Sequence, residues 1–296
     1  MEIKKAIISI GGLGTRFLPL SKVLPKEFWP LVDKPLVQYI VEEAKESGIS
    51  EIMFVISPDK KIVMDYFVKP ALKKTKKIKK ILKERKKHDL LEELSRLEEF
   101  LKDISFSYVF QKKPLGSGQA VLLAKNFAKE EGVAVLFGDD IVYAKVPCLS
   151  QLVRIFKTAQ KPVVALHRVA EEKTQFYGIV ETEKIASRLF KIKSIVEKPS
   201  PGKAPSDLAI VGKCIITPEV FSYLKKTKPT KTGETVLTLT LDDMIKDGKI
   251  VYGYEFEGEW LECGNKLGFL ETQIFLALRH PEFGEKLKQF LKNLKI

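Results

Sequence analysis

Residues 4–16, KKAIISIGGLGTR, place a short apolar run directly before a glycine-rich turn and an arginine. A continuous apolar run of this length is typical of a strand buried on both faces of a parallel sheet. The glycines at 11, 12 and 14 would stand at the carboxyl end of that strand, where open α/β sheets hold their ligands. Backbone N–H groups in such a turn can approach a phosphate or a base. This stretch therefore predicts an α/β fold, although an ordinary tight turn also explains the glycines alone.

Apolar strands alternate with helical segments over the next 150 residues. Residues 35–48 start with Pro35, stop at Gly48 and carry apolar positions at helical spacing, which predicts a helix. We expect further strands at 51–57, 106–111, 133–140 and 162–169, and helices at 117–129 and 149–160. Strand–helix–strand alternation predicts a sheet covered by helices on both faces.

The second half of the chain has a different pattern. After residue 170 the apolar runs become shorter, as in GIVETE, LFKIKSIVEK, LAIVGKCIIT and VYGYEFE. Such runs indicate antiparallel strands, and residues 266–294 indicate a C-terminal helical region. No long flexible linker separates the halves. We therefore expect one domain over 1–296, with a mixed, mainly parallel central sheet and an antiparallel-rich second half.

The net charge of +13 has a local origin. Residues 69–87 hold eleven Lys or Arg and one Glu, whereas residues 88–103 hold six acidic and two basic side chains. Both segments have helical apolar spacing, in Leu72, Thr75, Ile78 and Leu82 and then in Leu90, Leu94, Leu97, Leu101 and Ile104. No aromatic residue interrupts the lysines, so we expect a helix pair over about 70–104 and no nucleic-acid partner. The leucine seam leaves two roles open, packing within the chain or contact between subunits.

Composition excludes other classes of protein. No apolar run approaches the roughly 18 residues of a membrane span, and no signal-peptide core is present. Cys148, Cys214 and Cys263 are odd in number and far apart, which argues against a disulfide framework. We expect a cytoplasmic protein. Abundant Lys and Glu with only three Asn resemble the hyperthermophile trend, which weakens any inference from charge.

Charged residues follow several predicted strands. Arg16 and Lys26 stand within fifteen residues of the glycine turn, where two cations suit a polyanion. Asp139 and Asp140 close the strand at 133–140, and adjacent carboxylates there suit Mg²⁺, although an Asp-rich turn is the alternative. Glu197 and Lys198 follow another strand, where a surface ion pair is equally possible, and Glu262 adds a carboxylate at a strand-to-turn junction. His88, His167 and His280 are scattered and fit no metal or triad pattern.

Taken together, these motifs resemble the bacterial UTP–glucose-1-phosphate uridylyltransferases. The resemblance covers about residues 3–280, in family order, and includes the blocks GGLGTRFLPLSKVLPKE (11–27), QKKPLGSGQAVLLAK (111–125), GDDIV (138–142), YGIVE (177–181), VEKPSP (196–201), GETVLTLTLDDMI (233–245) and ECGNKLGF (262–269). It implies a Rossmann-like nucleotidyltransferase fold, UTP and a sugar 1-phosphate as small-molecule partners, Mg²⁺ as cofactor, and a homodimer or homotetramer. The helices at 70–104 fall where this family carries an insertion.

The resemblance also implies roles for individual residues. Gly12, Leu13 and Gly14 would approach the nucleotide, and Gln111 and Gly116 would recognise the uracil edge. Arg16 and Lys26 would hold the triphosphate, Lys198 would hold the sugar phosphate, and Gly178 and Glu197 would bind glucose hydroxyls. Asp139 and Glu262 would form the metal site.

Some positions depart from the family pattern. Glu262 stands where the family has Asp, Gln119 where it has His, and Gly11 where it has Ala. In the segment 233–239, Val236 and Leu239 replace an amide and a carboxylate on the sugar side. These changes leave open a related enzyme that uses another sugar or dTTP, or a catalytically weak regulator that binds sugar nucleotides.

Overall fold

The strand expected before the glycine turn, β1 (Lys5–Ile10), lies within a nine-stranded sheet. The computed structural model describes residues 2–68 and 72–294. The other strands of this sheet are β4 (Glu51–Ile56), β5 (Ser105–Phe110), β6 (Val133–Phe137), β8 (Val163–Arg168), β9 (Gly178–Ala186), β10 (Leu189–Glu197), β11 (Leu208–Ile216) and β12 (Tyr252–Glu255). Their order is β5-β4-β1-β6-β11-β8-β12-β10-β9, so both halves of the chain share one sheet.

The sheet has a parallel half and an antiparallel half. Strands β5, β4, β1 and β6 run parallel to one another, with β1 in register between β4 and β6. Strand β11 is antiparallel to both β6 and β8, and β10 is antiparallel to β12 and β9; among the described strands of this half, β8 and β12 alone are parallel. The mixed sheet with an antiparallel-rich second half is therefore confirmed.

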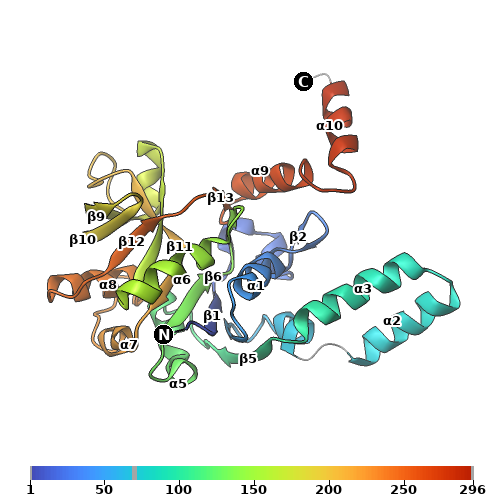
Figure 1. Cartoon of the computed structure of the whole chain (residues 1–296), viewed down its shortest axis with the longest axis horizontal. Coiled ribbons are helices and arrows are strands. Elements are labelled where there is room, and N and C mark those ends of the chain that lie inside the picture. Colours follow the sequence, from blue (N-terminus) through green and yellow to red (C-terminus); the bar gives the residue numbers. More distant parts are fainter. Residues whose placement is uncertain (1, 69–71, 295–296) are drawn as a thin grey trace.

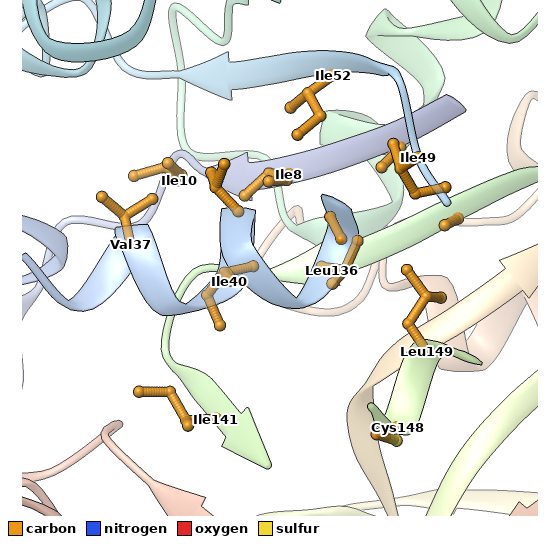
Figure 2. Packing of buried hydrophobic residues seen from close by; sticks show 14 of the residues in the cluster. Ile8, Ile10, Val37, Ile40, Ile49, Ile52, Leu136, Ile141, Cys148 and Leu149 are labelled. Atoms are coloured by element: carbon orange, nitrogen blue, oxygen red, sulfur yellow. The ribbon is translucent and has the colours of Figure 1, made fainter. Parts of the chain in front are cut away.

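Helices cover both faces of the sheet (Figure 1), because successive residues of the buried strands point to opposite sides. Ile8 and Ile10 of β1 pack in one core cluster and Ile7 packs in the other. The first cluster is covered by α1 (Leu36–Glu46) and α6 (Cys148–Ala159), and the second by α4 (Ser117–Leu123), α7 (Pro218–Leu224) and α8 (Leu237–Lys246). Figure 2 shows Val37 and Ile40 of α1 beside Ile8, Ile10 and Leu136 of the sheet.

The expected helix over 117–129 is divided, so that prediction is wrong in its extent. Helix α4 ends at Leu123 and a second short helix, α5 (Lys125–Ala128), follows. At the junction the amide of Ala124 bonds to the carbonyl of Val121, three residues back, which tightens the last turn and leaves Ala124 outside helical geometry. The remaining predicted helices and strands differ from the observed ones by only a few residues at their ends.

Two helical extensions stand apart from the sheet (Figure 1). The expected helix pair is confirmed as α2 (Leu72–Glu84) and α3 (His88–Leu101), while residues 69–71 lie outside the described residues. The C-terminal region is α9 (Lys266–Ala277) and α10 (Gly284–Asn293). Among the described residues, every helix is too short or too polar to span a membrane.

Short elements complete the chain. Apart from the strand end expected at Glu262, they were not predicted because each is too brief to carry a periodic pattern. They are the strand pairs β2 (Pro30–Leu31) with β3 (Lys34–Pro35) and β7 (Asp140–Tyr143) with β13 (Glu259–Glu262), and the helical turns η1 (Thr15–Phe17), η2 (Leu20–Lys22), η3 (Lys26–Phe28), η4 (Met64–Val68) and η5 (Glu171–Phe176). Three of them, η1, η3 and β13, carry residues of the predicted site.

Candidate active site

The carboxyl ends of the parallel strands bring the first predicted residues to one edge of the sheet. Gly11 follows β1, Gln111 follows β5 and Asp139 follows β6. A cavity of about 420 Å³ opens there, and its lining includes Gly12, Leu13, Lys26, Gln111, Gly116 and Asp139. The structure therefore places these six residues around one hollow, at the edge where open α/β sheets hold ligands.

Gly14 takes a different position from its two neighbours. It does not line this cavity; its carbonyl instead accepts bonds from the amide of Phe17 (2.9 Å) and the hydroxyl of Ser21 (2.8 Å). Its φ of 64° lies in the left-handed region, which turns the chain into η1. Gly14 thereby directs the segment that carries Arg16.

A buried amide closes one side of the cavity. Gln111 is only 5% exposed, and its Nε2 donates to the carbonyl of Gly116 (3.0 Å) and to Oε1 of Gln119 (2.7 Å). Gly116 has φ 92°, and a Cβ there would lie 2.4 Å from the carbonyl oxygen of Thr235. Only glycine fits this position. Gln119, where the family pattern has His, accepts a bond from Gln111 and so holds it against the turn at Gly116.

Lys26 and Asp139 form an ion pair inside the cavity. Nζ of Lys26 donates to Oδ2 of Asp139. Burial alone would lower the pKa of Lys26, but Asp139 and Glu27 outweigh it and raise that pKa. Burial likewise opposes ionisation of Asp139, but Lys26, Lys60 and Arg16 hold the pKa of its carboxyl below the usual value. Both groups are therefore charged at neutral pH.

A second ion pair supports Lys26 from behind. Nζ of Lys60 donates to both carboxylate oxygens of Glu27 at 2.9 Å, and both side chains are almost wholly buried. Because Glu27 adjoins Lys26 in η3, this pair anchors the turn that presents Lys26. Lys60 was not predicted from the sequence, since it is one of two adjacent lysines among the polar residues after β4 and carries no distinguishing signal.

A second cavity, of about 220 Å³, adjoins the first and shares Asp139 with it. Its lining includes Arg16, Gly178, Glu197, Lys198 and Glu262, together with Val236 and Thr238 of the segment that departs from the family; Leu239 does not line it. The structure thus brings the remaining predicted residues together on the far side of Asp139.

Polar contacts fix the position of Glu197 and Lys198. Oε2 of Glu197 accepts a bond from the hydroxyl of Thr238 (2.7 Å) and lies 3.0 Å from where a Cβ of Gly178 would be. Lys198 has φ 49°, a strained conformation for a side-chain-bearing residue, and its amide donates to the carbonyl of Tyr177 (2.9 Å). Its Nζ lies 4.0 Å from Oε1 of Glu197, and its side chain is 58% exposed, so an incoming anion can reach it.

Glu262 and Asp139 face the same point. A Cβ placed on Gly264 would lie 3.3 Å from Oε1 of Glu262, 3.5 Å from Oδ2 of Asp139 and 3.6 Å from Nη1 of Arg16. Oε2 of Glu262 accepts a bond from the hydroxyl of Tyr177 (2.8 Å). Burial and this bond raise the pKa of Tyr177, which keeps it a neutral donor. Tyr177 was not predicted as a site residue, although it precedes Gly178 in the motif.

The carboxylates of Asp139 and Glu262 fit a magnesium ion whose coordination is completed by a phosphate-bearing ligand. Within residues 2–68 and 72–294 no group of three or more His, Cys, Asp or Glu converges as a metal site. Two carboxylates do converge, and Mg²⁺ is commonly held by one or two carboxylates together with phosphate oxygens and water. Asp139 and Glu262 therefore suit the ion only in the presence of a phosphate ligand.

Asp140 differs from Asp139 in its surroundings. Its Oδ1 accepts a bond from Nε1 of Trp260 (2.9 Å), and it lines the second cavity. Burial and the neighbouring Asp139 raise the pKa of Asp140 to about 7. The sequence pattern predicted Asp139 and Asp140 together as carboxylates that suit Mg²⁺. It could not predict the bond from Trp260, which is 120 residues away from Asp140.

Comparison with known proteins gives consistent results over the whole chain. Residues 5–278 match the family model described as "Nucleotidyl transferase". The chain is 40% identical to the UTP–glucose-1-phosphate uridylyltransferase of Staphylococcus haemolyticus, over 99% of both chains. It is also similar to the UTP-bound UGPase from Acinetobacter baumannii (34% identity, TM-score 0.87, 99% of this chain and 100% of that chain). A UDP-glucose pyrophosphorylase complexed with UDP-glucose matches with 33% identity and a TM-score of 0.82, over 94% of this chain and 100% of that chain.

Proposed function

Since this chain belongs to the nucleotidyl transferase family, and within it to the UTP–glucose-1-phosphate uridylyltransferases, we propose that it makes UDP-glucose and pyrophosphate from UTP and glucose 1-phosphate. The observation that carries the proposal is that two cavities meet at Asp139, with Lys26 on one side and Arg16 and Lys198 on the other. One nucleotide and one sugar phosphate need two adjoining sites with cations where their phosphates meet.

The 420 Å³ cavity is the nucleotide site of this proposal. The backbone at Gly12 and Leu13 lies against the nucleotide, and Gly14 sets the direction of this turn. Gln111 and Gly116 face the uracil edge. Since Nε2 of Gln111 already donates within the protein, its Oε1 is the atom left to accept a bond from the base.

The 220 Å³ cavity is the sugar site. The Glu197 carboxylate accepts bonds from glucose hydroxyls, and Gly178 lets the ring approach the backbone. Lys198 meets the sugar phosphate. Thr238, which bonds Glu197, fixes that carboxylate although Val236 and Leu239 replace polar residues of the family pattern.

The reaction is a displacement at the α-phosphorus of UTP. A phosphate oxygen of glucose 1-phosphate attacks in line, a new P–O bond forms, and the bond to the β-phosphate breaks as pyrophosphate leaves. Lys26 and Arg16 stabilise the charge that develops on the phosphates, and the cavities hold the two anions in reach of each other. Mg²⁺, held by Asp139 and Glu262, would neutralise further phosphate charge.

A panel of substrates tests this function. Purified protein is assayed for pyrophosphate release with UTP, ATP, GTP, CTP and dTTP, each combined with glucose, galactose, mannose or N-acetylglucosamine 1-phosphate. We expect UTP with glucose 1-phosphate to give the highest kcat/KM. A clear preference for dTTP or another sugar would assign a related transferase, and binding without turnover would assign a regulator.

Glu262→Asp is expected to change the Mg²⁺ concentration for half-maximal rate by less than about tenfold. The shorter side chain withdraws its carboxylate by about 1.5 Å and gives up the bond from Tyr177, but the phosphates and Asp139 remain as ligands. Tyr177→Phe is the matched control, since it removes the same bond and keeps the carboxylate. A loss as large as that in Asp139→Ala would contradict this and make Glu262 a tightly fitted direct ligand.

The leucine seam of α3 supports a contact between subunits. Leu90, Leu94 and Leu97 line a groove of about 680 Å³ between α1, α2 and α3, and Leu90 is 51% exposed. In the proposed homodimer or homotetramer, replacing Leu94 and Leu97 by Glu lowers the mass measured by light scattering without unfolding the chain. Ser95→Glu, on the exposed side of α3, is the control. A lower melting temperature with unchanged mass would instead assign the seam to packing within the chain.

A further inference from the structure

Strand β11 is irregular where it passes the site. Its register with β8 shifts between Val211 and Cys214, which pair with the consecutive residues Ala165 and Val164. Gly212 and Lys213 are the extra residues, so they form a bulge. Bulges are frequent beside active sites, where they redirect a side chain.

The bulge directs Lys213 into the interior. Its side chain is wholly buried, and Nζ donates to the backbone carbonyl of Asp140 (2.6 Å) and pairs with Oε2 of Glu43 (2.9 Å). The other oxygen of Glu43 accepts a bond from the amide of Leu149, at the start of α6 (3.0 Å). Lys213 thus ties the turn after β6 to α1 and, through Glu43, to α6.

Stability alone does not account for a lysine at this place. Removing an ammonium and a carboxylate from water is costly, and apolar residues of similar size often replace such a pair with no loss of stability. Burial disfavours charge on Lys213, but Glu43 outweighs it and the pKa of Lys213 is raised, so the ammonium stays charged. Its second bond, to the carbonyl of Asp140, is the contact that an apolar residue could not supply.

Gly212 holds the same turn from its other side. A Cβ on Gly212 would lie 2.1 Å from Oδ2 of Asp140, so only glycine leaves room for that carboxylate. Trp260 holds the other oxygen. The bulge therefore fixes both the backbone and the side chain of Asp140, and Asp139 is the next residue along the chain.

We propose that Lys213 is a positioning residue for uridylyl transfer: by binding the backbone carbonyl of Asp140 it fixes the turn that places the Asp139 carboxylate against Lys26 and the divalent ion. This inference rests on the function proposed above. Lys213 touches neither cavity, so it acts only through this turn.

The test compares three full-length variants with the wild type, using Mn²⁺ as the probe ion. In the first variant, Lys213→Met is combined with Glu43→Gln, so that no unpaired charge remains in the core. Lys213→Arg is the conservative variant. Lys5→Met is the matched control, because Lys5 is a nearly buried strand lysine paired with Glu131 at the opposite end of β1 from the site. Circular dichroism gives the melting temperature of each.

The first readout is the dissociation constant of Mn²⁺ in the presence of UTP, measured by electron paramagnetic resonance without turnover. Loss of an outer contact to a metal-binding group typically weakens metal affinity by about 10–100-fold, and we expect a loss of this size in the double variant. We also expect its kcat to change more than its KM for glucose 1-phosphate. Lys213→Arg should recover most of the affinity. Lys5→Met should melt earlier and bind Mn²⁺ as the wild type does.

Two results would overturn the inference. Wild-type Mn²⁺ affinity in the folded double variant would show that Lys213 is only structural, as would an equal loss in Lys5→Met. If the wild type itself bound no Mn²⁺ with UTP, the proposed function would fail together with the role of Lys213. Failure of the role of Lys213 alone would leave Mn²⁺ binding by the wild type intact. Gly212→Ala provides an independent check: the displaced Asp140 should weaken Mn²⁺ binding while Lys213 stays in place, and unchanged binding would contradict the role of the bulge.

Discussion

Lys26→Ala is expected to lower kcat by about 100-fold or more while the fold remains intact. Lys26 lines the cavity that we propose as the nucleotide site and contacts Asp139, so it would stand where charge develops as pyrophosphate leaves. Removing one positioned charge donor of this kind typically costs about 10²–10³ in kcat. The measurement is steady-state kinetics, with the melting temperature recorded in parallel.

Lys22→Ala is the matched control for this experiment. Lys22 belongs to the same loop, is exposed and lies outside the lining of both cavities. Its kcat should stay close to that of the wild type. Near-normal turnover in Lys26→Ala would remove Lys26 from the catalytic residues, and an equal loss in both variants would indicate a general effect of positive charge in the loop.

Asp139→Ala is expected to have the largest effect, reducing kcat by about 1,000-fold or more, at the upper end of such losses. Asp139 lines both cavities, and it contacts Lys26 and faces Glu262 and Arg16 across Gly264. Its loss removes a proposed metal ligand and leaves Lys26 without its partner, which also costs stability. Activity should not return at high Mg²⁺.

Asp139→Asn separates the two causes. The amide keeps the shape of the side chain and removes its charge. If charge is what Asp139 supplies, Asp139→Asn should be nearly as inactive as Asp139→Ala but should melt closer to the wild type. Substantial activity in either variant would show that the metal and Lys26 are positioned by other residues.

The parallel half of the fold was predictable from the sequence because its signal is local. β1, β4 and β6 are continuous apolar runs, and α1 has its own start and stop residues. Strand β7 and its pairing with β13 were not predicted, since four residues carry no period and the pairing joins segments more than 100 residues apart; of β13, only the strand end at Glu262 was expected. Tertiary contacts alone create that pair, which carries Glu262.

The site shows the same division. Gly12, Lys26 and Asp139 stand at ends of strands or in a motif, so their positions followed from the sequence pattern and the family resemblance. Tyr177 and Lys213 act through partners that lie 85 and 73 residues away, at Glu262 and Asp140. A lysine inside an apolar strand carries no local sign of a distant carbonyl, so only the folded chain identifies it.

The transfer reaction itself is tested most directly by ³¹P NMR of the purified wild-type protein mixed with UTP, glucose 1-phosphate and Mg²⁺. We predict that the UTP signals decrease as UDP-glucose and pyrophosphate appear in equal amounts, and that neither product forms when glucose 1-phosphate is omitted. Consumption of UTP without UDP-glucose, or no reaction while both ligands bind, would contradict it.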